Sequence, residues 1–147
     1  MYAFDTSIEI AAPAERVWRA LCDPAEVVQW DTGVSGPIDP PPNYPRPGQH
    51  VRWRYTNGPF RVLHDRPKEV VAPRKLRSLL SLGPLRFDET YTLEPQGDGV
   101  LLTAAMLVWL PVPLAGPLIE RWYAGPAARA TVGASLRAIK RLCEDGG

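Results

Sequence analysis

Hydrophobic and polar residues alternate with a period of two along several stretches of this chain, and this period predicts β-strands. A first strand is expected around Ile8 and Ile10. Further alternating stretches follow in the middle of the chain, and turn-forming glycine, asparagine and proline residues separate them. These strands are expected within Gln49–Thr56, Phe60–Ala72, Arg74–Leu82, Leu85–Pro95 and Val100–Leu110. Such short connections predict successive antiparallel strands.

Helical spacing of apolar residues replaces this alternation near both ends of the chain. Ala12–Pro24 and Ala25–Trp30 predict two short helices that follow the first strand. Gly33–Gly48 is then a proline-rich loop with room for one short strand around Val34–Ile38. The C-terminal segment predicts a long helix, which Gly125–Pro126 is expected to kink or interrupt. Its apolar stripe consists of Val132, Leu136, Ile139 and Cys143.

The run Leu101–Ile119 is apolar enough to suggest a membrane span, because Thr103 is its single polar side chain. Its prolines argue against one continuous helix, since each removes a backbone donor and clashes with the preceding turn. Pro111, Pro113 and Pro117 all lie within seven residues. We therefore expect a strand to about residue 110, a bent loop and then the start of the terminal helix, with no transmembrane segment.

Composition narrows the possible functions. The 147 residues suffice for one domain, residues 1–147, and a formal net charge of +1 gives no general attraction to nucleic acid. Cys22 and Cys143 lack the spacing of a zinc or redox motif, and the first residues do not form a signal peptide. A cytoplasmic location is therefore expected. No metal-ligand cluster or glycine-rich phosphate loop is visible, so no cofactor is expected.

Several segments resemble one known family. They are Ser7–Trp30, Pro47–Tyr55, Glu69–Leu76, Glu89–Thr103 and Ser135–Glu144. Together they are similar to the START-like, helix-grip superfamily, also called SRPBCC, and to its polyketide cyclase/dehydrase-like branch. The resemblance covers nearly the whole chain. It implies an α+β fold in which a curved antiparallel sheet of about six to seven strands wraps around a long C-terminal helix, with two short helices between strands 1 and 2.

The resembled fold places a cavity between sheet and helix, so the face of each strand matters. The strand alternation then predicts a set of residues that point inward, and a shift of one residue would exchange the two faces. Ala104 and the small residues of the terminal helix leave room for a ligand. The alternative is a filled core. The expected ligand-binding residues on the strands are Trp53, Tyr55, Phe87, Ala104, Met106 and Val108.

Glu89 is the first candidate for chemistry, because its inward neighbours Phe87 and Tyr91 would place a carboxyl group in apolar surroundings. Burial raises the pKa of a carboxyl group, which would suit a general acid or base. The alternatives are a pair with an arginine at the cavity rim, or an outward position past a bulge. The Tyr91 hydroxyl could donate a hydrogen bond to a ligand carbonyl or enolate oxygen, or bond within the protein.

His64 is one of only two histidines. If its strand keeps Val62, His64 and Val70 inward, the imidazole enters the cavity and could transfer protons near neutral pH. Pro67 puts that alternation in doubt, and a structural or exposed histidine is the alternative. Asp31, after the second short helix, is expected to serve as a cap or loop residue.

Apolar residues around the proline-rich loop are expected at the cavity entrance of the resembled fold. They would form a gate for an apolar ligand or else cap the core. Wholesale exposure of these side chains would instead need a partner or a membrane surface as its explanation. The entrance residues expected to bind ligand are Trp109, Leu118, Trp122 and Tyr123.

Three functional hypotheses remain open at this point. The first is an apolar small-molecule protein that binds a polyketide-like ligand and cyclises or dehydrates it by acid–base chemistry, without a cofactor. The second is a non-catalytic carrier or sensor of lipids or metabolites. The third is a protein-interaction domain like the chaperone activators of the resembled superfamily. No nucleic-acid partner is expected, and the sequence leaves the oligomeric state open.

Overall fold

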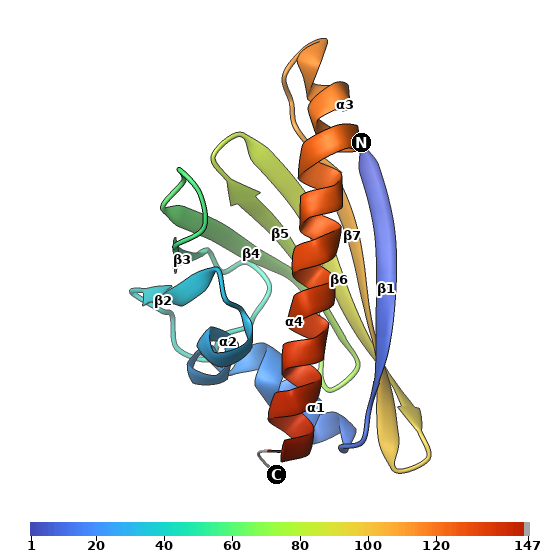
Figure 1. Ribbon diagram of the computed structural model, residues 1–147. Helices are drawn as coiled ribbons and strands as arrows, with labels where there is room; N and C mark the ends of the chain where they lie inside the picture. The colour runs from blue at the N-terminus through green and yellow to red at the C-terminus, as the bar shows by residue number, and fades with distance from the viewer. Residues whose placement is uncertain (146–147) are drawn as a thin grey trace.

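A computed structural model of the chain describes residues 1–145 and contains one seven-stranded antiparallel sheet (Figure 1). The strand order is β1-β7-β6-β5-β4-β3-β2, so the first strand of the chain pairs with the last. The strands are β1 (Tyr2–Ile10), β2 (Val34–Ile38), β3 (Val51–Tyr55), β4 (Val62–Val71), β5 (Lys75–Leu82), β6 (Leu85–Gln96) and β7 (Gly99–Trp109). All the predicted strands are present, including the short one in the proline-rich region.

Helices cover one face of this curved sheet. The two short helices α1 (Ala14–Cys22) and α2 (Pro24–Trp30) lie between β1 and β2, as predicted. The long helix α4 (Gly125–Asp145) crosses in front of the sheet along its whole length (Figure 1). Asp23 caps α2 by accepting a hydrogen bond from the Ala25 N–H, and Pro24 occupies the first turn. This arrangement confirms the predicted helix-grip fold.

The predicted apolar stripe of α4 forms one side of the core. Val132, Leu136, Ile139 and Cys143 are all buried, and the alternate β7 residues Val100, Leu102, Ala104, Met106 and Val108 are buried on the sheet side. Burying a Leu or Ile side chain stabilises the fold by about 1.5–3 kcal/mol, so this seam holds α4 on the sheet. The first turns of α4 carry mostly alanine on the same side, and they contribute less to that core.

A β-bulge in β4 determines which of its side chains face inward. The pairing of β4 with β5 shifts between Pro67 and Glu69, so one extra residue enters β4 there. Leu63, Asp65 and Pro67 consequently face the helices before the bulge, and Val70 does so after it. A strict alternation traced backward from Val70 therefore fails at the start of this strand.

The long apolar run after residue 100 is divided as expected. Strand β7 ends at Trp109, and helix α3 (Ala115–Ile119) begins after a proline-containing loop. A π-helical turn, η1 (Glu120–Ala124), then connects α3 to α4. Pro126 lacks an N–H and cannot continue the α-helical ladder, while the Gly125 N–H donates to the Glu120 carbonyl oxygen five residues back. Of the helices described, none has the length and apolar character needed to span a membrane.

Glycine at position 125 is required by a close approach. A Cβ atom there would lie 2.3 Å from the Tyr2 ring and 2.5 Å from the Glu120 carbonyl oxygen. Gly125→Ala should therefore lower the free energy of unfolding by about 1–3 kcal/mol, the usual range for overpacking. Gly133→Ala, in the same helix, is the matched control. Its Cβ would approach no atom closer than 3.5 Å, so replacement of this helical glycine should raise stability by about 1 kcal/mol. Urea unfolding measures both changes, and equal effects would contradict the steric argument.

Candidate functional site

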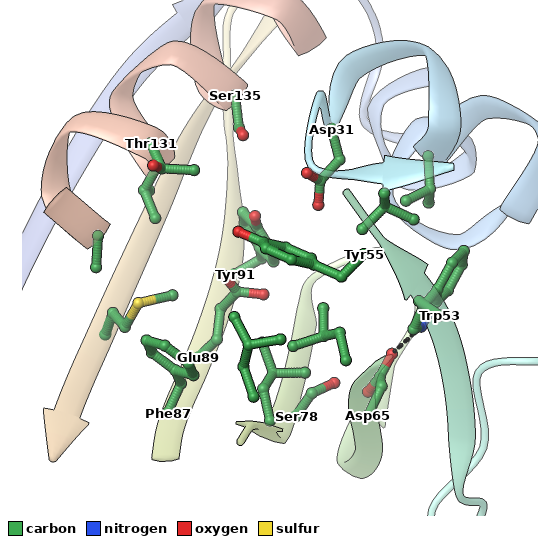
Figure 2. Close-up of a pocket in the computed structure, with 18 of the residues that line it drawn as sticks. Asp31, Trp53, Tyr55, Asp65, Ser78, Phe87, Glu89, Tyr91, Thr131 and Ser135 are labelled. Atoms are coloured by element: carbon green, nitrogen blue, oxygen red, sulfur yellow. Dashed lines mark hydrogen bonds between the residues drawn. The ribbon is translucent and has the colours of Figure 1, made fainter. Parts of the chain in front are cut away.

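A cavity of about 260 Å³ lies between the sheet and the first half of α4 (Figure 2). It exists because the residues that α4 presents there are small. Ala127, Ala128 and Thr131 of α4 line it together with Ala124 of η1, where large side chains would fill it. The opposite walls come from β3 to β6 and from the end of α2. The cavity expected from the resemblance is therefore present.

The lining changes from apolar to polar along the β5–β6 pair. Leu82 faces Leu85 across this pair, and the next inward pair is Leu80 with Phe87. Ser78 then faces Glu89, and Leu76 faces Tyr91. All of these residues line the cavity. One end of the cavity therefore suits an apolar group, and the middle offers polar contacts.

Glu89 is the central polar residue of the cavity. Its side chain is half-buried and points into the cavity from β6 (Figure 2). Desolvation, and to a smaller extent the nearby charges of Asp31 and Asp65, raise the pKa of this carboxyl group to about 8, against an opposing contribution from the Tyr91 hydroxyl. Glu89 is therefore mostly protonated at neutral pH, and its ionised form remains accessible.

Asp65 and Asp31 are two further carboxyl groups in the lining. Asp65 is buried on β4, and its Oδ2 accepts hydrogen bonds from the Tyr44 hydroxyl at 2.6 Å and the Trp53 indole N–H at 3.1 Å. Burial still raises the pKa of Asp65 above its usual value, despite these donors and the nearby Ser78 hydroxyl. Asp31 accepts the Gly33 N–H at 3.1 Å, and burial raises its pKa as well.

Aromatic side chains form much of the remaining wall. Trp53, Tyr55, Phe87 and Tyr91 lie there (Figure 2). Trp30 and Tyr44 line the cavity as well. The Trp30 indole N–H donates to the Ala20 carbonyl oxygen at 2.7 Å, and its ring meets Tyr91 edge to face at 6.5 Å between centroids. These contacts fix the rings in place. Burial raises the pKa of both Tyr55 and Tyr91, so their hydroxyl groups stay protonated and can donate hydrogen bonds.

The predicted inward orientation of His64 is wrong. His64 pairs with Arg52 on the outer face of the sheet, and its Nδ1 lies 2.8 Å from Nε2 of His50. The bulge in β4 is the physical reason, because it reverses the alternation upstream of Val70. Desolvation lowers the pKa of His64, and the nearby positive charges of Arg66 and Arg52 lower it further. His64 therefore cannot transfer a proton to a ligand in the cavity.

The other predicted ligand contacts divide into three groups. Trp53, Tyr55, Phe87 and Met106 line the cavity, as do the predicted catalytic residues Glu89 and Tyr91. Ala104 and Val108 point inward but are packed within the core and do not line the cavity. The predicted entrance residues do not line the cavity: Trp109 is half-buried, and Leu118, Trp122 and Tyr123 are exposed.

Sequence analysis did not identify Asp65 or the inward role of Asp31. The position of Asp65 between apolar Leu63 and Pro67, each two residues away, is the sequence signal that could have marked it. For Asp31 the expected loop role is present, since it accepts the Gly33 N–H. Asp31 also faces the cavity, and this position depends on how α2 lies over the sheet, which the sequence pattern does not give. Within the described residues, no group of three or more potential metal ligands is found.

Solved structures share this fold at low sequence identity. Protein CV1439 from Chromobacterium violaceum is 20% identical, with a TM-score of 0.76 over 97% of this chain and 96% of its own. Protein Ms6760 from Mycobacterium smegmatis is 17% identical, with a TM-score of 0.75 over 99% and 92%. DynU16, from the dynemicin biosynthetic locus, is 21% identical, with a TM-score of 0.65 over 98% of this chain and 49% of its own. A comparison with curated proteins gave no match.

The sequence itself matches a defined family over residues 1–144. That family is described as polyketide cyclase/dehydrase and lipid transport. The match agrees with the seven-stranded sheet, the two short helices after β1 and the long terminal helix. The chain belongs to the polyketide cyclase/dehydrase and lipid transport family.

Proposed function

We propose that the cavity binds a largely apolar, aromatic organic molecule that carries carbonyl groups, and that Glu89 catalyses its cyclisation or dehydration. The observation that carries this proposal is a carboxyl group with a pKa of about 8 that points into a cavity walled by aromatic and aliphatic side chains. A group with this pKa populates both protonation states near neutral pH, which suits a residue that first accepts and then donates a proton.

An aldol-type ring closure is the reaction that this geometry supports. The Glu89 carboxylate would take a proton from a carbon next to one ligand carbonyl group. The resulting enolate carbon would attack a second carbonyl carbon of the same ligand, and a C–C bond forms. The new alkoxide would take the proton back from Glu89, so the residue ends in its starting state. Loss of water from the product would then give an unsaturated ring.

Other lining residues support this reaction by position. The hydroxyl groups of Tyr55 and Tyr91 would donate hydrogen bonds to carbonyl oxygens as negative charge develops on them. The apolar end of the cavity, around Leu80 and Phe87, would hold the hydrocarbon part of the ligand. Holding a flexible chain in a folded shape lowers the barrier by itself, because the loss of freedom precedes the chemical step.

An aryl-substituted 1,5-diketone is a suitable probe, because its ring closure and loss of water give a cyclohexenone that absorbs in the ultraviolet. The wild-type protein should accelerate this closure, and Glu89→Gln should lower the rate by about 100-fold or more. Quenching of Trp30 and Trp53 fluorescence should show that the variant still binds the probe. Glu94→Gln, at an exposed position on β6, is the matched control and should leave the rate unchanged.

Other results of the diketone experiment would support a different function or contradict the proposal. A diketone that binds the wild-type protein without turnover would favour the carrier function, which also falls within the family description. Equal rates for wild-type protein and Glu89→Gln would contradict the role of Glu89. Failure of all apolar aromatic probes to bind would contradict the cavity as a ligand site. Mass spectrometry of the protein under native conditions would identify a ligand retained through purification.

A further inference from the structure

The polar part of the cavity carries acidic groups without a cation. Asp31, Asp65 and Glu89 all line it, each from a different segment of the chain. Across the described residues 1–145, no lysine, arginine or histidine lines it. The formal net charge of the whole chain is nevertheless +1, so this acidic character belongs to the cavity and not to the protein in general.

Asp65 is a buried acid whose hydrogen-bond donors are all neutral groups. Its side chain is only 5% exposed, and both of its hydrogen-bond donors, Tyr44 and Trp53, contact the same oxygen, Oδ2. Its Oδ1 is buried and has no hydrogen-bond partner among the described residues. Buried carboxyl oxygens are normally satisfied, because an unpaired one retains its full desolvation cost. The Ser78 hydroxyl lies close enough to lower the pKa of Asp65, but it carries no positive charge.

The aromatic wall around these acids fits a cation as well as an apolar group. The rings of Trp30, Trp53, Tyr55 and Tyr91 line the same cavity as the carboxyl groups. Tryptophan and tyrosine faces attract ammonium groups, most strongly where water is excluded. The cavity thus combines negative charge with aromatic faces, a combination that favours organic amines over carboxylates.

We infer that the ligand of this cavity carries a protonated amine, which lies among Asp31, Asp65 and Glu89. This inference rests on the proposed function and specifies its ligand class. The ammonium group would supply the countercharge that the protein itself does not provide, and charge-assisted hydrogen bonds would hold it. A fatty acid or another carboxylate would instead bring a negative charge into a cavity whose ionisable groups are acids, and it should be rejected. The apolar body of the amine would lie toward Leu80 and Phe87.

Three probes of one shape test this inference. They are 2-naphthylmethylamine, 2-naphthylmethanol and 2-naphthoate, which carry a positive, neutral or negative group on the same ring system. Isothermal titration calorimetry of the wild-type protein at neutral pH should show that the amine binds about tenfold or more tightly than the alcohol. The carboxylate should bind at least about tenfold more weakly than the alcohol.

Isosteric variants assign the preference to the acids. Asp65→Asn and Glu89→Gln should each reduce the ratio of amine to alcohol affinity severalfold and leave the alcohol affinity nearly unchanged. Asp31→Asn provides a third variant, which keeps the test decisive if loss of the Asp65 hydrogen bonds impairs folding. Glu94→Gln removes an acidic group outside the cavity and should leave the ratio unchanged.

The results separate this inference from the proposed function. If none of the three probes binds, the cavity is not a site for aromatic ligands and both proposals fail. If the alcohol binds as tightly as the amine, or the carboxylate binds as tightly as the alcohol, only the amine inference is overturned. An amine preference that survives in all three isosteric variants also overturns it, because the acids would not be its cause.

Discussion

Replacement of Glu89 by glutamine should make the protein more stable at alkaline pH and should remove most of its loss of stability between about pH 5 and pH 9. In the folded protein, desolvation raises the pKa of Glu89 to about 8 from its ordinary value of 4.5. The folded state therefore keeps a proton that the unfolded chain releases. As the pH rises through this window, the free energy of unfolding falls, because the folded protein must ionise a desolvated carboxyl group.

The size of this effect follows from the displacement of the pKa. One unit corresponds to about 1.4 kcal/mol, so Glu89 alone can cost up to roughly 5 kcal/mol of stability above pH 8. Glutamine carries no charge at any of these pH values, so the variant avoids this cost. Near pH 4 the two proteins should be similarly stable. Asp31 and Asp65 also have raised pKa values, so part of the pH dependence will remain in the variant.

Urea unfolding at pH 5, 7 and 9 measures this difference. The gap between Glu89→Gln and wild-type protein should widen steadily with pH, with the variant the more stable. Glu94→Gln lies on the same strand but on its exposed face, and its stability curve should follow that of the wild-type protein. A gap that stays constant with pH would show that Glu89 ionises normally, and the acid–base role proposed for it would lose its physical basis.

Substitution of Thr131 by tryptophan should nearly abolish ligand binding without unfolding the protein. Thr131 lines the cavity from α4 but is an exposed residue and is not part of the packed core. A larger side chain at this position can therefore enter the cavity without displacing core residues. The indole ring would take up a large part of the 260 Å³ cavity. Affinity for an aromatic probe should fall about 100-fold, or about 2.8 kcal/mol of binding free energy, because the indole ring and the probe would compete for the same space.

Ala130→Trp is the matched control for this experiment. Ala130 is exposed on the same helix, one residue away, and does not line the cavity. Calorimetric titration with 2-naphthylmethanol should show wild-type affinity for this variant and very weak binding for Thr131→Trp. Urea unfolding should place both variants within about 0.5 kcal/mol of the wild-type protein. Normal binding by Thr131→Trp would place the ligand site outside the cavity.

The site residues that sequence analysis identified lie on regular strands. Strand β6 has an unbroken register with both neighbours, so Phe87, Glu89 and Tyr91 keep the alternation that their order predicts. The same reasoning failed for His64 because β4 contains a bulge, and a single inserted residue exchanges the two faces of a strand. Whether the correctly placed residues bind a ligand stays a prediction until the binding experiments are done.

The orientation of the predicted entrance residues could not be predicted from the sequence, for a different reason. Trp122 and Tyr123 were expected beside the cavity mouth, but both lie in the π-helical turn η1 and point to solvent. A π-helix has more residues per turn than an α-helix, so successive residues turn through a smaller angle, and the side chains of η1 point in directions that an α-helix would not give. Pro126 explains why the ladder changes, although its position alone does not give the orientation of the rings.

The sequence by itself determined the order of the elements, the split of the long apolar run and the apolar stripe of α4, because these depend on local spacing and on the backbone limits of proline. It also placed Glu89 among apolar neighbours. Only the tertiary structure decided that Asp31, Asp65 and Glu89 share one cavity. These residues lie in three separate segments, and their meeting depends on sheet order, on the bulge in β4 and on the position of α2. Long-range packing sets all three, and neither the pattern of one strand nor that of one helix contains it.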